Sequence, residues 1–250
     1  MKSILTIAGL DPCGGAGIHA DILTISSLGF HPCSVVTVIT FQNTCTISGI
    51  FEIKSDAIRE QILAVTRDVN LAGIKVGLVC SIEAAKTIAE TIEKLDVPKV
   101  VDPVLKATVG FKFTNDIGYK ILAKVCDVIT PNVYELSILS QCNIRSVEDV
   151  KKAARLVAEK FNCSVVVTGG SLGGKDVVFD KNNFYIVEEE LVEKEVHGTG
   201  CVYSSALTCY LAKGFELLEA CEKARKFIYN AVKNNKNIGR CLPIVNPQPL

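Results

Sequence analysis

Histidine and paired cysteine, the usual zinc ligands, are scarce in this sequence. It has three dispersed histidines, and its eleven cysteines form no Cys-x-x-Cys motif. This pattern predicts neither a zinc site nor a disulfide framework. We therefore expect reduced cysteines in a cytoplasmic protein. Those in apolar stretches are expected to pack as small hydrophobic side chains: Cys33, Cys126, Cys163, Cys209 and Cys221.

Net charge and long apolar runs are also absent. Lysine and arginine together number 27, as do aspartate and glutamate, so the charge balance does not predict a nucleic acid or an anionic membrane as a partner. No segment approaches the ~18 consecutive apolar residues that indicate a membrane-spanning helix. Residues 1–9 lack the charged flank and the cleavage site of a signal peptide. We expect neither nucleic acid nor membrane as a partner.

Apolar residues make up 48 % of the chain, enough for a sizeable core. The expected strands are residues 3–9, 34–40, 73–77, 99–104, 127–130 and 163–168, with a weaker hairpin at 176–180 and 183–188. The expected helices are residues 18–28, 55–68, 82–95, 116–125, a segment after Asn132, 147–161, and two within 201–236. This alternation predicts an α/β fold of three layers, α/β/α, around a mostly parallel sheet. No linker or repeat interrupts residues 1–250, which we expect to form one domain.

Five residues, His197-Gly198-Thr199-Gly200-Cys201, stand at the start of an apolar helical pattern. Glycines before a helix let backbone N–H groups converge, and the first turn adds free donors and the positive end of the helix dipole. Such a site binds anions, typically phosphate. A thiol there is expected to have a lowered pKa. The alternative is an ordinary turn followed by a small core cysteine.

A second glycine-rich loop, Gly14-Gly15-Ala16-Gly17, follows the first expected strand. Its spacing matches neither the Gly-x-Gly-x-x-Gly fingerprint nor a P-loop, which disfavours a dinucleotide-binding fold. Flanked by Asp11 and Asp21, the loop can bring the backbone close to a small ligand. A simple tight turn is the alternative.

Other polar residues follow expected strands, where parallel sheets bind ligands. Asp102 ends an apolar strand, and Asn132 and Glu135 are one helical turn apart. Two carboxylates so placed can hold Mg²⁺ beside phosphates. Taken singly, Asn132 is equally well explained as a helix cap, and Glu135 as a first-turn carboxylate that favours the helix dipole.

Gln42 ends the second expected strand, in the segment Gln42-Asn43-Thr44. Its amide offers both a donor and an acceptor, which suits binding to a heterocycle that carries both kinds of hydrogen-bonding group. The alternative is a polar loop residue. His19 and His31 have no assigned role, and His197 is expected to shape its turn.

Together these motifs resemble the ribokinase-like superfamily and, within it, the hydroxymethylpyrimidine (phosphate) kinases of thiamine biosynthesis. The opening segment, residues 6–21, follows that family's first signature closely, and the resemblance runs from end to end. The remaining motifs that carry it are Gln42-Asn43-Thr44, Lys75-Val76-Gly77, Val101-Asp102-Pro103-Val104, Thr130-Pro131-Asn132 with Glu135, Gly169-Gly170, and residues 197–201.

The resemblance implies a ribokinase-like fold and an ATP- and Mg²⁺-dependent kinase. Its substrate would be 4-amino-5-hydroxymethyl-2-methylpyrimidine, phosphorylated once and then again to the pyrophosphate. The implied substrate residues are Gly9, Ala16, Asp21, Gln42 and Leu78, and the implied ATP-binding residues are Asn132, Thr168, Gly169 and Gly170. Asp102 and Glu135 would position magnesium, Gly198, Thr199 and Gly200 would form the anion hole, and Cys201 would take the hydroxyl proton.

The sequence departs from the family pattern at two cationic positions. Thr168 stands where many relatives have lysine before Gly-Gly, and Thr108 stands where many have lysine after Asp-Pro-Val-x-x-Ala. Lys106 lies two residues from the second gap and is a candidate replacement. The missing cations bear most on the second phosphorylation, in which the substrate already carries a phosphate.

Two alternatives remain. A pyridoxine or pyridoxal kinase of the same family would share the anion hole, and Gln42 favours the aminopyrimidine over it. A non-catalytic sensor of the precursor would need neither Cys201 nor the carboxylates Asp102 and Glu135. Relatives of this kind are commonly homodimers, so we expect a homodimer.

Overall fold

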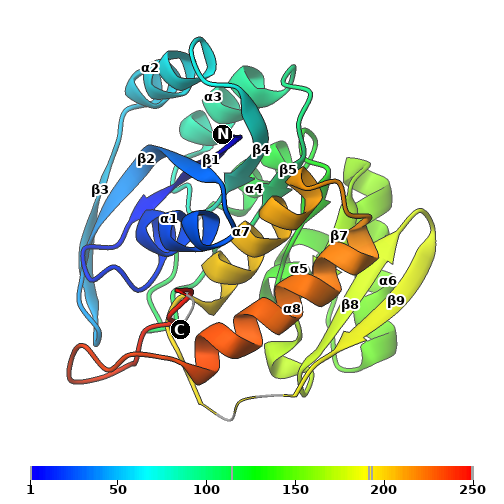
Figure 1. Ribbon diagram of the computed structural model, residues 1–250. Coiled ribbons are helices and arrows are strands. Elements are labelled where there is room, and N and C mark those ends of the chain that lie inside the picture. The colour runs from blue at the N-terminus through cyan, green and yellow to red at the C-terminus, as the bar shows by residue number, and fades with distance from the viewer. Residues whose placement is uncertain (1, 114, 191, 193, 249–250) are drawn as a thin grey trace.

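A computed structural model describes residues 2–113, 115–190, 192 and 194–248. Nine strands form one sheet (Figure 1). The strands are β1 (Ser3–Leu10), β2 (His31–Gln42), β3 (Ile47–Glu52), β4 (Leu71–Val76), β5 (Lys99–Val101), β6 (Val128–Ile129), β7 (Ser164–Val167), β8 (Lys175–Asp180) and β9 (Asn183–Glu188).

The spatial order of the strands is β3-β2-β1-β4-β5-β6-β7-β8-β9. The six strands from β2 to β7 are parallel to their neighbours, whereas β3 at one edge and β8 and β9 at the other are antiparallel. The predicted mostly parallel sheet is confirmed. Parallel strands end on the same side, so the segments that follow them gather at one edge of the sheet.

Helices cover both faces of the sheet, as Figure 1 shows. They are α1 (Gly17–Ser27), α2 (Ser55–Thr66), α3 (Ile82–Ile92), α4 (Asp116–Leu122), α5 (Val133–Ser140), α6 (Val147–Phe161), α7 (Thr199–Ala212) and α8 (Leu217–Lys233). The core on one face includes residues of α2 to α6, and the core on the other includes residues of α1, α7 and α8. This is the predicted three-layer α/β/α architecture.

The strands supply both cores because successive side chains point to opposite faces. In β5, Val100 packs with the α7–α8 side, whereas Val101 packs with the α2–α6 side, and both are fully buried. The neighbouring strand β6 repeats the pattern with Val128 and Ile129. A strand buried on both faces reads as a continuous apolar run, which is the pattern that predicted these strands.

Local signals set several boundaries. Ser81 and Ser146 cap α3 and α6 by accepting a backbone N–H with the hydroxyl group. The expected hairpin is confirmed: β8 and β9 join through Lys181 and Asn182, both with positive φ. This is the conformation that a two-residue hairpin turn favours.

The strand β3 was not predicted. It is exposed along much of its length and contains Gly49, so its sequence shows neither a continuous apolar run nor a clear alternation. Within the described residues, no helix is long and apolar enough to cross a membrane.

Candidate active site

A cleft of about 920 Å³ runs along the carboxyl ends of the parallel strands. It extends from Gly9 and Asp11 at the end of β1, past Asp102 after β5, to Val232 in α8. The sequence places polar residues after separate strands, and the topology brings them to one cavity.

The amino-terminal end of α7 faces this cleft, since Gly198, Thr199, Gly200 and Cys201 all line it. Gly198 is the N-cap of the helix, with φ of 93°. A Cβ at this position would collide with the carbonyl oxygen of Gly15, so only glycine fits. The free N–H groups of the first turn suit an anion.

The Cys201 thiol does not have the lowered pKa that we expected. Burial raises its pKa to about 12, and the Asp21 and Asp102 charges add to this effect. The Lys75 ammonium group and the backbone N–H of Gly17 act in the opposite direction without reversing it. The prediction was wrong because it considered the stabilising effect of the helix end on the thiolate but not the cost of burying that thiolate.

Asp21 does not line the substrate pocket, contrary to the expectation. Its carboxylate is completely buried and accepts hydrogen bonds from Thr6 (2.6 Å) and Ser205 (2.8 Å). Lys75 Nζ lies 2.9 Å from each Asp21 oxygen. Burial alone would lower the pKa of Lys75, but the negative charges of Asp21, Cys201 and Asp102 raise it overall. Asp21 therefore holds a permanent cation near Cys201.

Asp11 is the carboxylate that does reach the cleft, and sequence reasoning gave it no role. It accepts backbone N–H groups from Cys13 (2.9 Å), Gly15 (3.2 Å) and Ala16 (3.0 Å). These donors of the glycine-rich loop are thus bound by the chain's own carboxylate. The spacing of Asp11 two to five residues before them was the available signal.

Asp11 also brings together two residues that we considered separately. His197 Nε2 lies 3.1 Å from Asp11 Oδ2 and 2.8 Å from the side-chain amide nitrogen of Gln42. His197 is therefore more than a turn residue, because it contacts both the glycine-rich loop and Gln42.

The other expected substrate residues line the cleft: Gly9, Ala16, Gln42 and Leu78. Gly9 has no room for a side chain, since an added Cβ would lie 2.9 Å from Val38 Cγ1 and 3.0 Å from Leu78 Cδ2. Leu78 packs with Val38 and with Phe113, a residue that we did not predict. This end of the cleft combines an apolar wall with one amide.

The expected metal residues, Asp102 and Glu135, both line the cleft. Burial raises the pKa of Asp102. Burial and the neighbouring Asp102 charge raise the pKa of Glu135 to about 8. Ser204 donates a hydrogen bond to Asp102 Oδ2 (3.1 Å), and Glu135 accepts the backbone N–H groups of Asn132 (2.9 Å) and Leu105 (3.3 Å).

Two buried carboxylates that repel each other suit a bound cation, because its charge would offset both the cost of burying them and their mutual repulsion. Among the described residues, no group of three or more His, Cys, Asp or Glu side chains forms a ready metal cage. Magnesium typically takes one or two protein carboxylates and completes its shell with water and phosphate, so a pair is sufficient.

At the far end, Asn132, Thr168 and Gly170 line the cleft as expected for ATP-binding residues. Asn132 is also the N-cap of α5 and forms a capping box with Glu135, so the helix-cap alternative is confirmed. Gly169 is not a lining residue: it is buried, and its N–H donates to Asp176 (2.6 Å). Gly169–Ser171 form a 3-10 turn after β7, in which Gly169 is buried and Gly170 is exposed.

Three cationic side chains border the cleft in the described part of the chain: Lys106, Lys194 and Arg225. The candidate replacement Lys106 therefore reaches the cavity. Its backbone pairs with Lys112, and Ala107 N–H donates to Phe111 (2.8 Å), which folds residues 105–113 into a hairpin-like flap.

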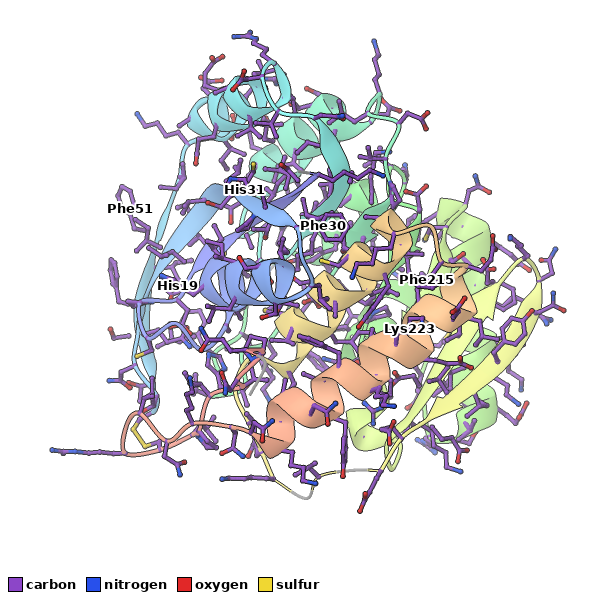
Figure 2. All side chains as sticks on the ribbon, viewed as in Figure 1. His19, Phe30, His31, Phe51, Phe215 and Lys223 are labelled. Atoms are coloured by element: carbon purple, nitrogen blue, oxygen red, sulfur yellow. A yellow bond between two sulfur atoms is a disulfide. The ribbon has the colours of Figure 1, made fainter. Side chains whose placement is uncertain are left out.

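The expectation that no cysteine forms a disulfide is wrong. Cys45, after β2, is bonded to Cys241, after α8, across 196 residues of sequence (Figure 2). The other nine cysteines of the described chain are free. Residues 236–246, here the C-terminal strap, also pair with His197, which donates its backbone N–H to Pro243 (2.9 Å) and accepts one from Val245 (3.0 Å).

The chain is similar to known kinases over nearly its whole length. A family model described as phosphomethylpyrimidine kinase matches residues 11–246. A hydroxymethylpyrimidine/phosphomethylpyrimidine kinase of Aquifex aeolicus is 35 % identical over 251 residues, which cover 97 % of this chain and 98 % of that one.

Solved structures show the same fold. The ADP complex of Bacillus subtilis pyridoxal kinase has a TM-score of 0.89 at 31 % identity, covering 98 % of this chain and 97 % of that one. The phosphomethylpyrimidine kinase of Clostridium difficile 630 has a TM-score of 0.79 at 33 % identity, covering 92 % and 100 %. The chain belongs to the phosphomethylpyrimidine kinase family, with a ribokinase-like fold.

Proposed function

We propose that this protein transfers a phosphoryl group from ATP to the hydroxymethyl oxygen of 4-amino-5-hydroxymethyl-2-methylpyrimidine. A second transfer to the monophosphate then gives the pyrophosphate used in thiamine biosynthesis. The observation that carries the proposal is that one cleft holds the amide of Gln42, the helix end with Cys201, and the carboxylates Asp102 and Glu135. The names of the similar kinases support it.

The substrate end suits a small heterocycle. Leu78 and Phe113 offer an apolar wall for the ring, and Gln42 offers a donor and an acceptor for its amino group and ring nitrogen. Gly9 keeps the floor of the pocket free of a side chain. These contacts would hold the hydroxymethyl group toward the amino-terminal end of α7.

The transfer step is mainly positioning and charge neutralisation. The free N–H groups of Thr199, Gly200 and Cys201 would hold the oxygens of the transferred group. Cys201 would accept the hydroxyl proton, and Lys75 is the buried cation that favours its thiolate form. Only the thiolate form of Cys201 can accept this proton. A loose transition state needs the proton to leave only late, so a small thiolate fraction is compatible with the reaction.

Asp102 and Glu135 would hold Mg²⁺, directly or through water, and Asn132 and Thr168 would contact the nucleotide phosphates. When bound, the ion neutralises phosphate charge. For the second step, Lys106 is the proposed partner of the substrate phosphate, because it lies on the cleft two residues before Thr108. Gly170 and the backbone around it would contact the nucleotide.

We also propose a cytoplasmic homodimer in which residues 1–250 form one domain. Nine of the eleven cysteines are free, which favours a reducing compartment, whereas the Cys45–Cys241 disulfide favours an oxidising compartment. Strand β3 is one edge of the sheet; Phe51 in β3 is 59 % exposed, and Phe41 in the neighbouring β2 is 52 % exposed. Figure 2 shows Phe51 on the outer side of this edge. Exposed aromatic side chains at a sheet edge suit a second copy of the chain.

The second candidate is a pyridoxal kinase, favoured by the fold similarity to the Bacillus subtilis enzyme. An assay of ADP release with the pyrimidine alcohol, its monophosphate and pyridoxal as separate substrates decides between them. We expect ADP release to require a substrate, and kcat/KM to be highest for the two pyrimidines. A preference for pyridoxal contradicts the proposal, and pyrimidine binding without ADP release identifies a sensor.

A further inference from the structure

The hydrogen-bond network around His197 joins three parts of the site. Its Nε2 atom faces Asp11 Oδ2 at 3.1 Å and the terminal amide of Gln42 at 2.8 Å. Its Nδ1 atom faces Thr108 Oγ1 in the flap at 3.4 Å. The imidazole ring of His197 thus contacts the carboxylate that binds the glycine-rich loop, the amide of Gln42 and the flap.

The Asp11 carboxylate limits how these hydrogens can be arranged. A carboxylate only accepts hydrogen bonds, so Nε2 must carry a hydrogen for its contact with Asp11 to be favourable. Asp11 cannot turn away, because its oxygens are held by the N–H groups of Cys13, Gly15 and Ala16. An Nε2 lone pair facing the carboxylate would be repulsive and, at this buried position, costly.

The hydrogen on Nε2 determines which end of the Gln42 amide can face it. An amide N–H directed at Nε2–H would place two donors against each other, whereas the amide oxygen accepts from it. The amide reaches this orientation by a half turn about its terminal bond. Its NH₂ group then faces Thr40 Oγ1, 3.3 Å from the other end of the amide, and the Thr40 hydroxyl donates to the Leu10 carbonyl oxygen (3.0 Å).

We propose that Asp11 and His197 are positioning residues that select one orientation of the Gln42 amide and thereby favour an aminopyrimidine over pyridoxal. This inference rests on the proposed function. An aminopyrimidine presents an amino donor beside a ring-nitrogen acceptor, and only an amide held in one orientation matches both. Pyridoxal lacks the amino group and gains less from a fixed amide.

The test compares two substitutions of similar size and polarity. In His197→Gln the amide reaches the position of Nε2 and can donate to Asp11, whereas in His197→Asn it is too short. We expect His197→Asn to lower the ratio of kcat/KM for the pyrimidine to kcat/KM for pyridoxal by about tenfold, the effect of losing one net hydrogen bond. His197→Gln should recover most of that ratio.

A double-mutant cycle separates positioning from a general structural role. In a Gln42→Ala background, His197→Asn should leave the substrate ratio unchanged, because no amide remains to orient. His31→Gln is the matched control; His31, labelled in Figure 2, is exposed at the start of β2, whereas the cleft lies at the carboxyl end of that strand. Equal losses on both substrates in His197→Asn, or no recovery in His197→Gln, overturn the positioning role. Failure of the unmodified protein to phosphorylate the pyrimidine overturns the proposed function instead.

Discussion

Cys201 lies where two opposing electrostatic effects meet. The helix end and Lys75 favour a thiolate, whereas burial and the neighbouring carboxylates disfavour it, and the net result is a pKa of about 12. At neutral pH the residue is therefore a thiol. Only its small thiolate fraction can accept the hydroxyl proton, which limits the contribution of Cys201 to the rate.

We predict that Cys201→Ala lowers kcat by about 10²-fold, the lower end of the range for a general base. KM for the pyrimidine should change little, because the thiol is proposed to act on the proton and the ring is held elsewhere. Steady-state kinetics measure both constants. Cys209→Ala, a buried cysteine farther along α7, is the control, and near-normal kcat in Cys201→Ala would exclude the base role.

Glu135 gives the stability of the protein a pH dependence. Its pKa is about 8 in the folded protein and 4.5 for an ordinary glutamate. Between these values the folded state binds more protons than the unfolded state, so the free energy of unfolding falls as pH rises. The slope is at most about 1.4 kcal/mol per pH unit.

Glu135→Gln should remove this component, since glutamine does not titrate and can keep the capping contact with Asn132. Urea unfolding at pH 5.5 and 7.5 measures it, and the unmodified protein should lose about 2–3 kcal/mol more than the variant over this interval. Glu93→Gln, in the exposed C-cap of α3, serves as the control. Equal slopes in all three proteins would contradict the assignment.

At the residue level, the sequence correctly placed at the cleft Gln42, the last residue of β2, and Asp102, which directly follows β5. The prediction failed for Asp21, since helix periodicity does not indicate whether the carboxylate points into the cleft or pairs with a buried lysine. It also failed for the Cys201 pKa, which depends on burial that emerges only when β4, α1 and α7 pack together.

At the scale of elements, strand and helix alternation predicted most of the sheet, and the Asp180–Asn183 turn predicted the β8–β9 hairpin. The strand β3 and the flap over residues 105–113 escaped prediction. Both are short, partly exposed segments whose conformation is set by backbone pairing with β2 and within the flap, which side-chain patterns do not report.

The start of α7 depends on glycine, and a matched pair of variants measures how strongly. Gly198 and Gly214 lie just before and just after α7, with φ of 93° and 90°. Alanine at either position should cost about 1–2 kcal/mol in backbone strain. Alanine at Gly198 also meets the Gly15 carbonyl oxygen, whereas nothing lies within 4 Å of a Cβ at Gly214.

We therefore predict that Gly198→Ala lowers the free energy of unfolding by about 1–3 kcal/mol more than Gly214→Ala, the usual cost of overpacking. It should also reduce kcat, because the glycine-rich loop and the anion site shift apart. Chemical unfolding and kinetics measure the two effects. Similar values for the two variants would show that the contact between the loops is unimportant.

For the whole molecule, the sequence predicted the three layers of the fold but not the disulfide that links two distant segments of the chain. Cys45 and Cys241 are 196 residues apart and neither has a cysteine at paired spacing, so nothing local links them. They meet because the turn after β2 and the C-terminal strap both pack beside the cleft. Leu242 donates its backbone N–H to Thr44 (3.2 Å), and Val245 donates to His197 (3.0 Å).

The disulfide should therefore affect both stability and the site. Cross-linking residues so far apart restricts the unfolded chain, and Cys45→Ser should lower the free energy of unfolding by about 3–5 kcal/mol. Because the strap also holds the backbone of His197, KM for the pyrimidine should rise in the same variant. Unfolding and kinetics with and without a dithiol reductant measure both effects: the reductant should convert the unmodified protein to the behaviour of Cys45→Ser and leave that variant unchanged. Cys142→Ser, at a half-buried free cysteine, is the control. A reductant without effect on the unmodified protein would mean that these two thiols do not pair in solution.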